Sequence, residues 1–346
     1  MDKMSVCFAI SKEISRWNSF VLANPNGGNI FSSFEYAQQK ETGCCKRRFI
    51  FVNKLTVTIL EKNTPPLGKL WYVPKVPNVT SAKSLFDTLK ILEPFAKKRG
   101  VLTVRIETEL PPIQQPTHAK HGLKEAAPII LNPSSITLDL TPKLEEIPMN
   151  LPQKGRHTIH RAERDGVIVE QVASDENCHT MYALLNETVE GQFGVRSNNY
   201  YRTFWQRFEK SGYSQLFFAS FEGRIVAGAY ATVYGTKSTF KDGASIRKIT
   251  TYGISHFLQW NVIHWAKKRG SLVHDFCGSP PSDELYNNNH PHHDIGLLKT
   301  TFSKTVTDYI GCYDLVISPV RYKAWSKLGE RIYRHFYFKR TNDCYY

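Results

Sequence analysis

The stretch AKKRGVLTVRIE, residues 96–107, is echoed by AKKRGSLVHDF at residues 266–276. Each copy is typical of a basic helix end, a glycine that stops the helix, and a β-strand. Basic helix ends followed by glycine are common, so one short match could arise by chance. The order of elements around the two copies is also parallel. Together the two observations predict two copies of one α/β unit.

The residues around the first copy predict strands and a helix. The runs RRFIFV at 47–52 and LTVTILEK at 55–62 are rich in β-branched and aromatic residues, which is typical of strands. Apolar residues at helical spacing, Leu85, Leu89 and Leu92, predict a helix that ends at Gly100. A strand from 101 follows, so this part of the chain is predicted to form a βαβ unit.

The residues around the second copy predict a similar series. QKGRHTIHRAERDG, 153–166, is typical of a basic helix, and two further helices are expected within 179–212. Residues 215–245 hold three strand-like runs separated by short turns, and 251–270 predicts a long amphipathic helix. We expect a domain boundary near residue 143. The first domain would cover 1–142, completed by 316–346, and the second would cover 143–315.

The composition limits the class of partner. The net charge is +14 over 346 residues, which suits a polyanion such as RNA, a pyrophosphate-bearing substrate or an anionic membrane face. A basic protein without a specific polyanion is the alternative. Seven cysteines without a CxxC spacing argue against a zinc site or disulfide framework and favour a reducing cytoplasm. No transmembrane helix or signal peptide is predicted.

The basic helix carries a face of cations. Arg156, His160 and Arg164 lie at i, i+4 and i+8, and Arg161 lies beside them. Such a face suits RNA or lipid phosphates. An ordinary solvated helix face is the alternative interpretation.

Three other stretches carry candidate chemistry. In GQFGVRSNNYY, Arg196 and Tyr200 follow a Gly-rich turn at a helix start, where free N–H groups could help to bind an anion. HPHHD, 290–294, is a weak metal candidate, because adjacent loop histidines rarely converge on one ion, and no metal is expected. IGLLKTTFSK places Lys299 alone among apolar or small residues.

The order of these landmarks resembles the FemABX family, the aminoacyl-tRNA-dependent transferases that build peptidoglycan cross-bridges. The resemblance runs from about residue 29 to 320. Its motifs, in family order, are IFSSFEYAQQK, YVPKVP, LDLTPK, GRHTIHRAERDG, FGVRSNNYY, YGTKSTFKDGAS, FLQWNVIHWAKKRG, HDFCG, IGLLKTTFSK and YIGCYDLVISP. Ser32 stands where the family usually has Gln, and Val76 replaces a usual glycine.

The resemblance implies an α/β (α+β) fold of two tandem GNAT-like acyltransferase domains with mixed, largely antiparallel sheets. It implies transfer of an amino acid from aminoacyl-tRNA, as co-substrate, to the side-chain amine of the peptidoglycan stem peptide. No other cofactor is expected. The acceptor is left open between UDP-linked and lipid-linked pentapeptide. No coiled-coil insertion precedes Arg196, so the chain resembles the shorter branch of the family.

The resemblance also assigns roles to individual residues. Lys40, Arg196 and Tyr200 match positions that hold the diphosphate-bearing precursor. Lys299 matches the lysine placed at the aminoacyl ester, where a positive charge would stabilise the tetrahedral oxyanion of ester aminolysis.

Two further residues depart from the family pattern. Phe240 and Asp242 replace a pair of tyrosines, which removes two hydroxyls and brings a carboxylate expected to repel phosphate. Asp242 and Asp294 are candidates for a general base, and a substrate group is the alternative.

Two other functions compete with this one. An acyl-CoA-dependent N-acyltransferase would need a Gly-rich pyrophosphate loop, and GASIRKITTYGIS at 243–255 lacks that spacing. A non-catalytic RNA- or envelope-precursor-binding protein on the same fold is the other alternative.

Overall fold

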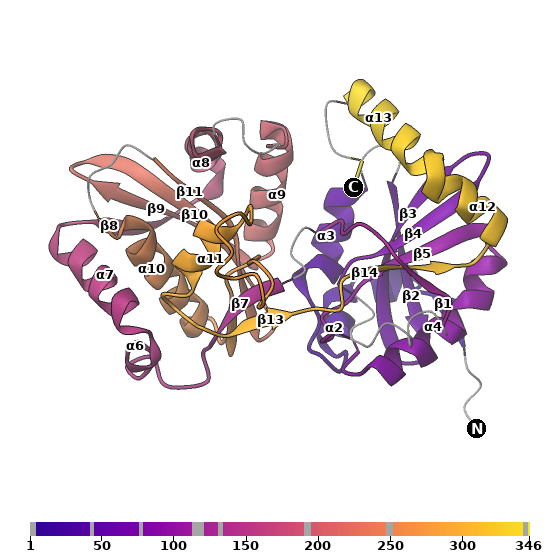
Figure 1. Ribbon diagram of the computed structural model, residues 1–346, viewed down its shortest axis with the longest axis horizontal. Coiled ribbons are helices and arrows are strands. Elements are labelled where there is room, and N and C mark those ends of the chain that lie inside the picture. The colour runs from indigo at the N-terminus through magenta and orange to yellow at the C-terminus, as the bar shows by residue number, and fades with distance from the viewer. Residues whose placement is uncertain are drawn as a thin grey trace. The chain divides into compact units, whose positions relative to one another are not determined.

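The computed structural model divides the chain into two compact units (Figure 1). Unit 1 comprises Met1–Pro133 and Asp308–Tyr346, and unit 2 comprises Ser134–Thr307. The structure describes residues 5–41, 45–75, 79–112, 121–130, 134–189, 195–246, 252–341 and 345–346.

Unit 1 is built on a mixed seven-stranded sheet in the order β1-β2-β3-β4-β5-β14-β6. Its strands are β1 (Val6–Phe8), β2 (Cys45–Val52), β3 (Leu55–Thr64), β4 (Gly68–Val73), β5 (Val101–Glu107), β6 (Leu123–Glu125) and β14 (Cys312–Val316). Most neighbours are antiparallel, whereas β4 and β5 pair in parallel across the helix that joins them. This connection is the predicted βαβ unit.

The helices of unit 1 lie at the faces and ends of this sheet. They are α1 (Ser11–Ile14), α2 (Trp17–Leu22), the 3₁₀ turn η1 (Ile30–Ser32), α3 (Phe34–Lys40), α4 (Ala82–Lys97), α12 (Pro319–Ala324), the π-helical segment η2 (Trp325–Gly329) and α13 (Glu330–Thr341). The predicted apolar face of α4, with Leu85, Leu89 and Leu92, packs into one core with β2, β3 and β5. Burial of that face stabilises the helix on the sheet.

Unit 2 is built on a second mixed seven-stranded sheet, in the order β13-β7-β12-β11-β10-β9-β8. Its strands are β7 (Ser134–Asp139), β8 (Ile168–Val172), β9 (Ser214–Phe221), β10 (Arg224–Tyr234), β11 (Lys237–Ser245), β12 (Val273–Asp275) and β13 (Val306–Asp308). The predicted three-strand meander is confirmed as β9, β10 and β11, which pair antiparallel in sequence.

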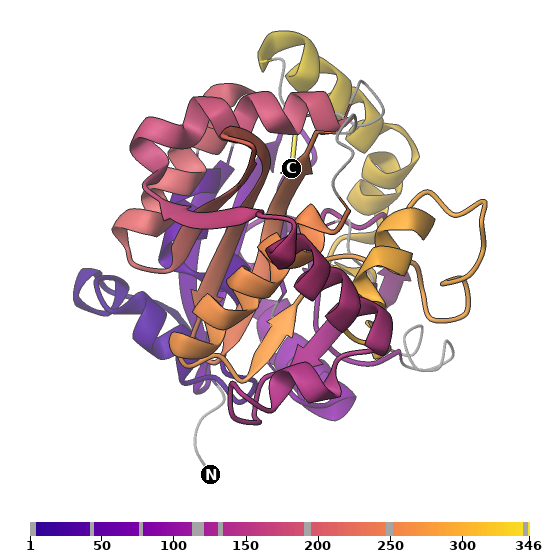
Figure 2. The same ribbon diagram turned by 90° about the vertical axis from the view of Figure 1, so that its left-hand side faces the viewer.

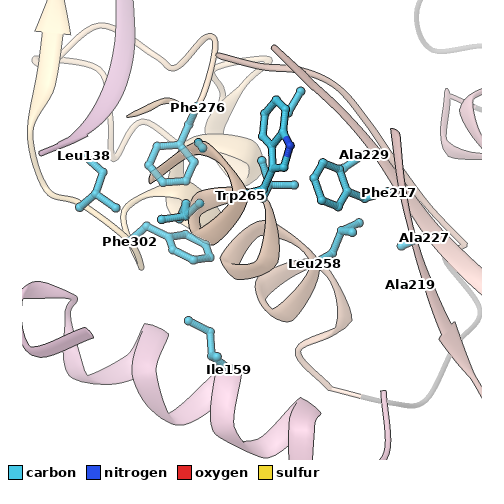
Figure 3. Close-up of a cluster of buried hydrophobic side chains, with 14 of the residues drawn as sticks. Leu138, Ile159, Phe217, Ala219, Ala227, Ala229, Leu258, Trp265, Phe276 and Phe302 are labelled. Carbon is cyan, nitrogen blue, oxygen red and sulfur yellow. The ribbon is translucent and has the colours of Figure 1, made fainter. Parts of the chain in front are cut away.

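Helices cover both faces of the sheet in unit 2 (Figure 2). They are α6 (Ile147–Asn150), α7 (Gln153–Arg164), α8 (Ser174–Val189), α9 (Asn198–Lys210), α10 (Ile254–Lys268) and α11 (His293–Lys299). The long helix α10 crosses one face with α7 packed against it, while α8 and α9 contact the other. Between α10 and the sheet lies the core shown in Figure 3, with Phe217, Leu258 and Trp265.

The observed division differs slightly from the expected domain boundaries. Unit 2 begins at 134 rather than 143, because β7 pairs with β12 and so belongs to the second sheet. The chain returns to unit 1 at 308 rather than 316, because β14 pairs with β5. Among the described residues, no helix is long and apolar enough to cross a membrane. The predicted tandem α/β architecture with largely antiparallel mixed sheets is confirmed.

Candidate functional site

Lys299 lies in the last turn of α11, and its side chain is almost entirely buried, at 8% exposure for the residue. Its ammonium group donates hydrogen bonds to two backbone carbonyls, those of Cys277 and, at 2.5 Å, Gly278. An ammonium has three N–H donors, so this pair accounts for two of them. Burial without such partners would be costly for a charged group. The Lys299 side chain is therefore held inside unit 2 by specific hydrogen bonds and is not a solvated surface lysine.

The turn after β12 presents these carbonyls. The Asp275 carboxylate accepts a hydrogen bond from the backbone N–H of Cys277 at 2.7 Å and another from the Ser135 hydroxyl. Cys277 has φ of 60° and Gly278 has φ of 77°. A left-handed conformation is uncommon for a non-glycine residue and marks a turn whose geometry is imposed by its surroundings. The Asp275 carboxylate thus helps to hold the turn that faces Lys299.

The environment acts on the acidity of Lys299. Burial lowers its pKa below 10.5, and the nearby Cys277 and Asp275 oppose that shift. Coulomb interactions act strongly in such a partly dry site. A charge held there can stabilise an anion that forms beside it.

Close backbone packing fixes α11 in place. A Cβ added at Gly296 would lie 2.6 Å from Pro280 Cδ, so this face of the helix fits only glycine. At the other end, a Cβ added at Gly155 in α7 would lie 1.9 Å from the Thr301 carbonyl oxygen. The start of α7 therefore packs directly on the turn that follows Lys299.

A cavity of about 150 Å³ adjoins this region at the start of α10. Leu298, Ser245, Ser255 and His256 line it with four apolar or glycine residues, namely Val226, Ile246, Gly253 and Ile254. His256 Nε2 has no hydrogen-bond partner among the described residues. Burial, together with the charge of Lys154, lowers the pKa of His256 to about 4. The cavity thus combines an uncharged imidazole with the first N–H groups of a long helix, which favour negative charge.

The stretch 243–255, which lacks the spacing of a pyrophosphate loop, contributes residues to this cavity, and 247–251 lie outside the described residues. The Gly-rich turn at 191–194 also lies outside them.

Arg196 and Tyr200 are brought together as expected. Helix α9 begins at Asn198, and the Ser197 hydroxyl accepts a hydrogen bond from the backbone N–H of Tyr200, as an N-cap does. The Arg196 guanidinium lies 4.5 Å from the centre of the Tyr200 ring, a cation–π contact. The Tyr182 hydroxyl donates to the carbonyl of Arg196 at 3.1 Å. Arg196 is thus positioned at the start of α9.

A β-bulge separates the two residues that depart from the family pattern. Tyr230 pairs with Asp242 and Ala231 pairs with Phe240, so Lys241 is the extra residue of the bulge. Phe240 packs against the core under α10, whereas Asp242 accepts a hydrogen bond from Trp205 Nε1 in α9 at 3.0 Å. Phe240 and Asp242 therefore lie on opposite faces of the sheet.

Asp242 is not an isolated charge, and the expected repulsion of phosphate by its carboxylate stays a prediction. Its carboxylate pairs with the Lys241 ammonium at 2.9 Å. Burial lowers the pKa of Lys241, but Asp242, Tyr200 and Tyr201 together outweigh it and raise that pKa above 10.5. Lys241 also lies 5.1 Å from the Phe204 ring centre. Sequence reasoning missed this lysine, because the bulge that turns it toward α9 leaves no mark in the strand pattern.

Lys40 belongs to unit 1. It lies in the last turn of α3, with its ammonium 5.6 Å from the Tyr36 ring centre. The helix itself is confirmed, and the role of Lys40 stays a prediction.

The basic face of α7 is only partly available to a ligand. The Arg156 guanidinium donates to the carbonyls of Met149 at 3.1 Å and Leu151 at 2.6 Å, which lie at the end of α6. Arg156 therefore ties two helices together through one guanidinium nitrogen, and its role toward phosphate stays a prediction. Arg161 pairs with Asp165 at 3.5 Å and His160 with Glu163 at 3.8 Å, while Arg164 is exposed.

The histidine-rich stretch forms no metal cluster. Within the described ranges, no group of three or more His, Cys, Asp or Glu side chains could hold a metal ion. His293 pairs with Asp294 at 3.1 Å, and the Asp294 side chain is almost fully exposed.

The sequence matches the acetyltransferase (GNAT) domain family over residues 153–287, within unit 2. It is 23% identical over 111 residues to a lipid II:glycine glycyltransferase of Staphylococcus aureus, strain USA300. That alignment covers 32% of this chain and 26% of the relative, so the chain matches about a quarter of the relative's length.

Two solved structures superpose on nearly the whole chain. The crystal structure of FemX superposes with a TM-score of 0.78 at 15% identity, covering 94% of this chain and all of that one. A tandem GNAT protein from the clavulanic acid biosynthesis pathway superposes with a TM-score of 0.50 at 10% identity, covering 91% of this chain. With a GNAT-family match in unit 2 and this superposition over nearly its full length, the chain has a tandem GNAT fold like that of FemX.

Proposed function

We propose that the chain transfers an amino acid from aminoacyl-tRNA to the side-chain amine of a peptidoglycan precursor stem peptide. The FemX-like fold and the distant similarity to lipid II:glycine glycyltransferases support the reaction class. The observation that carries the proposal is the buried ammonium of Lys299, held by two carbonyls next to the cavity that Leu298 lines.

Ester aminolysis is favoured by positive charge beside the oxygen atoms on which negative charge develops. The acceptor amine attacks the ester carbon, a tetrahedral oxyanion forms, and the C–O bond to the ribose breaks to release an alkoxide that takes up a proton. Lys299 uses two N–H donors on Cys277 and Gly278. The third would meet the oxyanion or the departing ribose oxygen. A fixed donor of this kind stabilises the transition state without reorganisation.

The acceptor would bind near the start of α9. Arg196 on the Tyr200 ring would supply positive charge of the kind that a diphosphate requires. Phe240 does not contribute a polar contact, since its ring packs into the core.

The attacking amine must lose a proton, since a free lysine amine has a pKa of about 10.4. Asp242 is paired with Lys241 and with Trp205, and Asp294 projects into solvent. Neither carboxylate is therefore well suited to act as the base. A phosphate or ribose hydroxyl of the substrates would take the proton instead.

An acyl-CoA-dependent N-acyltransferase is the second candidate. It is favoured by the GNAT-family match and by the cavity at the start of α10, where helix N–H groups suit a pyrophosphate. The two candidates differ in the acyl donor, which is an RNA ester in one and a thioester in the other.

The deciding experiment offers both donors to the same protein. Purified protein is incubated with pooled aminoacyl-tRNA or acetyl-CoA, and with UDP-linked or lipid-linked pentapeptide. RNase-sensitive incorporation that is lost in Lys299→Ala and retained in Lys304→Ala would support the tRNA-dependent reaction. Lys304 is a matched control, because it is exposed and five residues away. Incorporation only from acetyl-CoA would overturn the proposal in favour of the second candidate.

We place this reaction on the cytoplasmic side of the membrane, where charged tRNA and both forms of the precursor are present.

A further inference from the structure

The C-terminal helix α13 exposes apolar side chains in a row. Leu328 of η2 is 58% exposed, and Ile332 and Phe336 of α13 are 40% and 67% exposed. They follow one another at intervals of four residues, so they form a stripe along one side of the helix. Phe338 is also exposed. Leu328, Ile332 and Phe336 are here called the apolar stripe, because Phe338 follows Phe336 by two residues and lies on a different side of the helix.

Basic residues flank the apolar stripe. Residues 319–341 contain seven Lys or Arg and a single acidic residue, Glu330, which gives a net charge of +6. Arg331 and Lys339 are exposed beside the stripe, and Lys327 and Arg340 extend the charge along the segment. An apolar face flanked by Lys and Arg is a feature of helices that lie in the plane of a membrane interface.

The opposite side of α13 is firmly attached to unit 1. The Glu330 carboxylate accepts hydrogen bonds from Arg105 of β5, at 2.6 and 3.0 Å. The Tyr333 hydroxyl donates to the Pro65 carbonyl at 2.6 Å. The apolar stripe therefore lies on the side of α13 away from these contacts. Figure 1 shows the course of α13 in unit 1.

We propose that the outer face of α13 is a docking surface for an anionic lipid bilayer. The positive charge of the segment complements negatively charged headgroups, while the aliphatic side chains of Leu328 and Ile332 need an apolar environment that RNA phosphates do not offer. A second copy of this chain would bring the same cations against each other, which opposes self-association through this face.

The docking surface stands apart from the proposed transfer reaction. It uses none of the residues assigned to that reaction, and vesicle binding is measured without tRNA or precursor. Failure of either proposal therefore leaves the other to be judged separately.

The test is co-sedimentation of the full chain with vesicles. Phosphatidylcholine vesicles are compared with vesicles of phosphatidylcholine and phosphatidylglycerol in equal amounts. We expect binding to the anionic vesicles only, and weaker binding as salt rises. Arg331→Gln with Lys339→Gln should lower the partition coefficient about 25-fold, since each cation contributes about fivefold. Ile332→Ser with Phe336→Ser should lower it about tenfold or more.

Matched controls carry the same changes elsewhere. Lys97→Gln with Lys98→Gln removes two exposed cations from the end of α4, and Met149→Ser removes an apolar side chain that is 77% exposed in unit 2. Both should bind vesicles like the unaltered chain, and thermal unfolding checks that every variant is folded.

Three results would overturn the proposal. The first is no binding of the unaltered chain to anionic vesicles, or equal binding by the α13 variants. The second is loss of transfer RNA binding in those variants while vesicle binding persists. The third is a dimer in sedimentation velocity that the Ile332→Ser, Phe336→Ser variant converts to a monomer.

Discussion

The ammonium group of Lys299 lies 2.5 Å from the carbonyl oxygen of Gly278, across 21 residues of chain. The contact joins the last turn of α11 to the strained turn after β12, where Cys277 is left-handed. Main-chain acceptors hold a buried lysine ammonium in place, and their hydrogen bonds compensate for the water that the charged group has lost. Substitutions at this residue can therefore separate a structural role from a chemical one.

Lys299→Ala should reduce amino-acid transfer about 100-fold or more, the usual effect of removing one oxyanion donor. It should also cost roughly 1–3 kcal/mol of unfolding free energy, because two partly buried carbonyls lose their donor. Single-turnover transfer and urea unfolding measure the two effects. Lys299→Met fills the same space without charge and should be as inactive but more stable. A Lys299→Met variant with unaltered transfer would refute the chemical role.

Asp242→Asn should destabilise unit 2 by about 2 kcal/mol, since it leaves the Lys241 ammonium without its charged partner. The shape of the side chain and an acceptor for Trp205 are retained. Burial would then dominate and the pKa of Lys241 would fall. The double variant Lys241→Met, Asp242→Asn should recover part of the loss in urea unfolding. Equal stability of the single variant and the unaltered chain would contradict the pairing.

Much of the fold could be predicted from the sequence, and the two AKKRG segments show why. Helix periodicity, a stopping glycine and a β-branched run are local signals, and the structure has the helix–glycine–strand series at both α4–β5 and α10–β12. The bulge at Lys241 gives no such signal. Strict alternation would place Phe240 and Asp242 on the same face, and only the register with β10 shows that they part.

In the candidate site, contacts between residues close in sequence could be predicted, whereas contacts between distant residues could not. Arg196 and Tyr200 meet because a Ser N-cap and a four-residue spacing place them together. The partners of Lys299 are backbone carbonyls. Every residue has one, so the sequence does not indicate which of them accept these hydrogen bonds. The same holds for Arg156. Its acceptors are the carbonyls at the end of α6, and no residue type in the sequence indicates them.

Gly155→Ala should destabilise unit 2 by about 3 kcal/mol, because the new methyl group would overlap the Thr301 carbonyl. Helix α7 would have to move away from the turn after Lys299, so transfer should fall as well. Thermal unfolding and transfer are compared with Lys154→Ala, an exposed neighbour on the same helix. A Gly155→Ala variant as stable as this control would contradict the close approach.

Arg196→Gln should raise the KM for the diphosphate-bearing precursor about tenfold or more and leave kcat nearly unchanged. Charge-assisted hydrogen bonds to phosphate are worth about 1.5–3 kcal/mol, and the proposed role of Arg196 is to bind the precursor and not to take part in the chemical step. Arg202→Gln, on the exposed side of the same helix, is the matched control. A fall in kcat with an unaltered KM would assign Arg196 to the chemical step instead.

The pH dependence of stability should be set in part by His274, which is fully buried. Burial lowers its pKa to about 3. The Gln259 amide N–H donates to Nε2 at 2.8 Å, which leaves the ring proton on Nδ1, 2.8 Å from the Ser238 hydroxyl. Both ring nitrogens are therefore satisfied in the neutral form, and a second proton would face a donor.

The sign of the effect follows from the two pKa values. The unfolded chain binds a proton at His274 below about pH 6.5, whereas the folded chain does so only near pH 3, so protons favour unfolding between these values. The contribution of His274 is fully present above pH 6.5 and should have fallen by roughly 3 kcal/mol at pH 4.5. Urea unfolding at pH 7 and 4.5 measures the loss, and His274→Gln should flatten it. An imidazole resonance of His274 that titrates near pH 6.5 in the folded protein would show that the buried ring accepts a proton after all, and the predicted loss would then vanish.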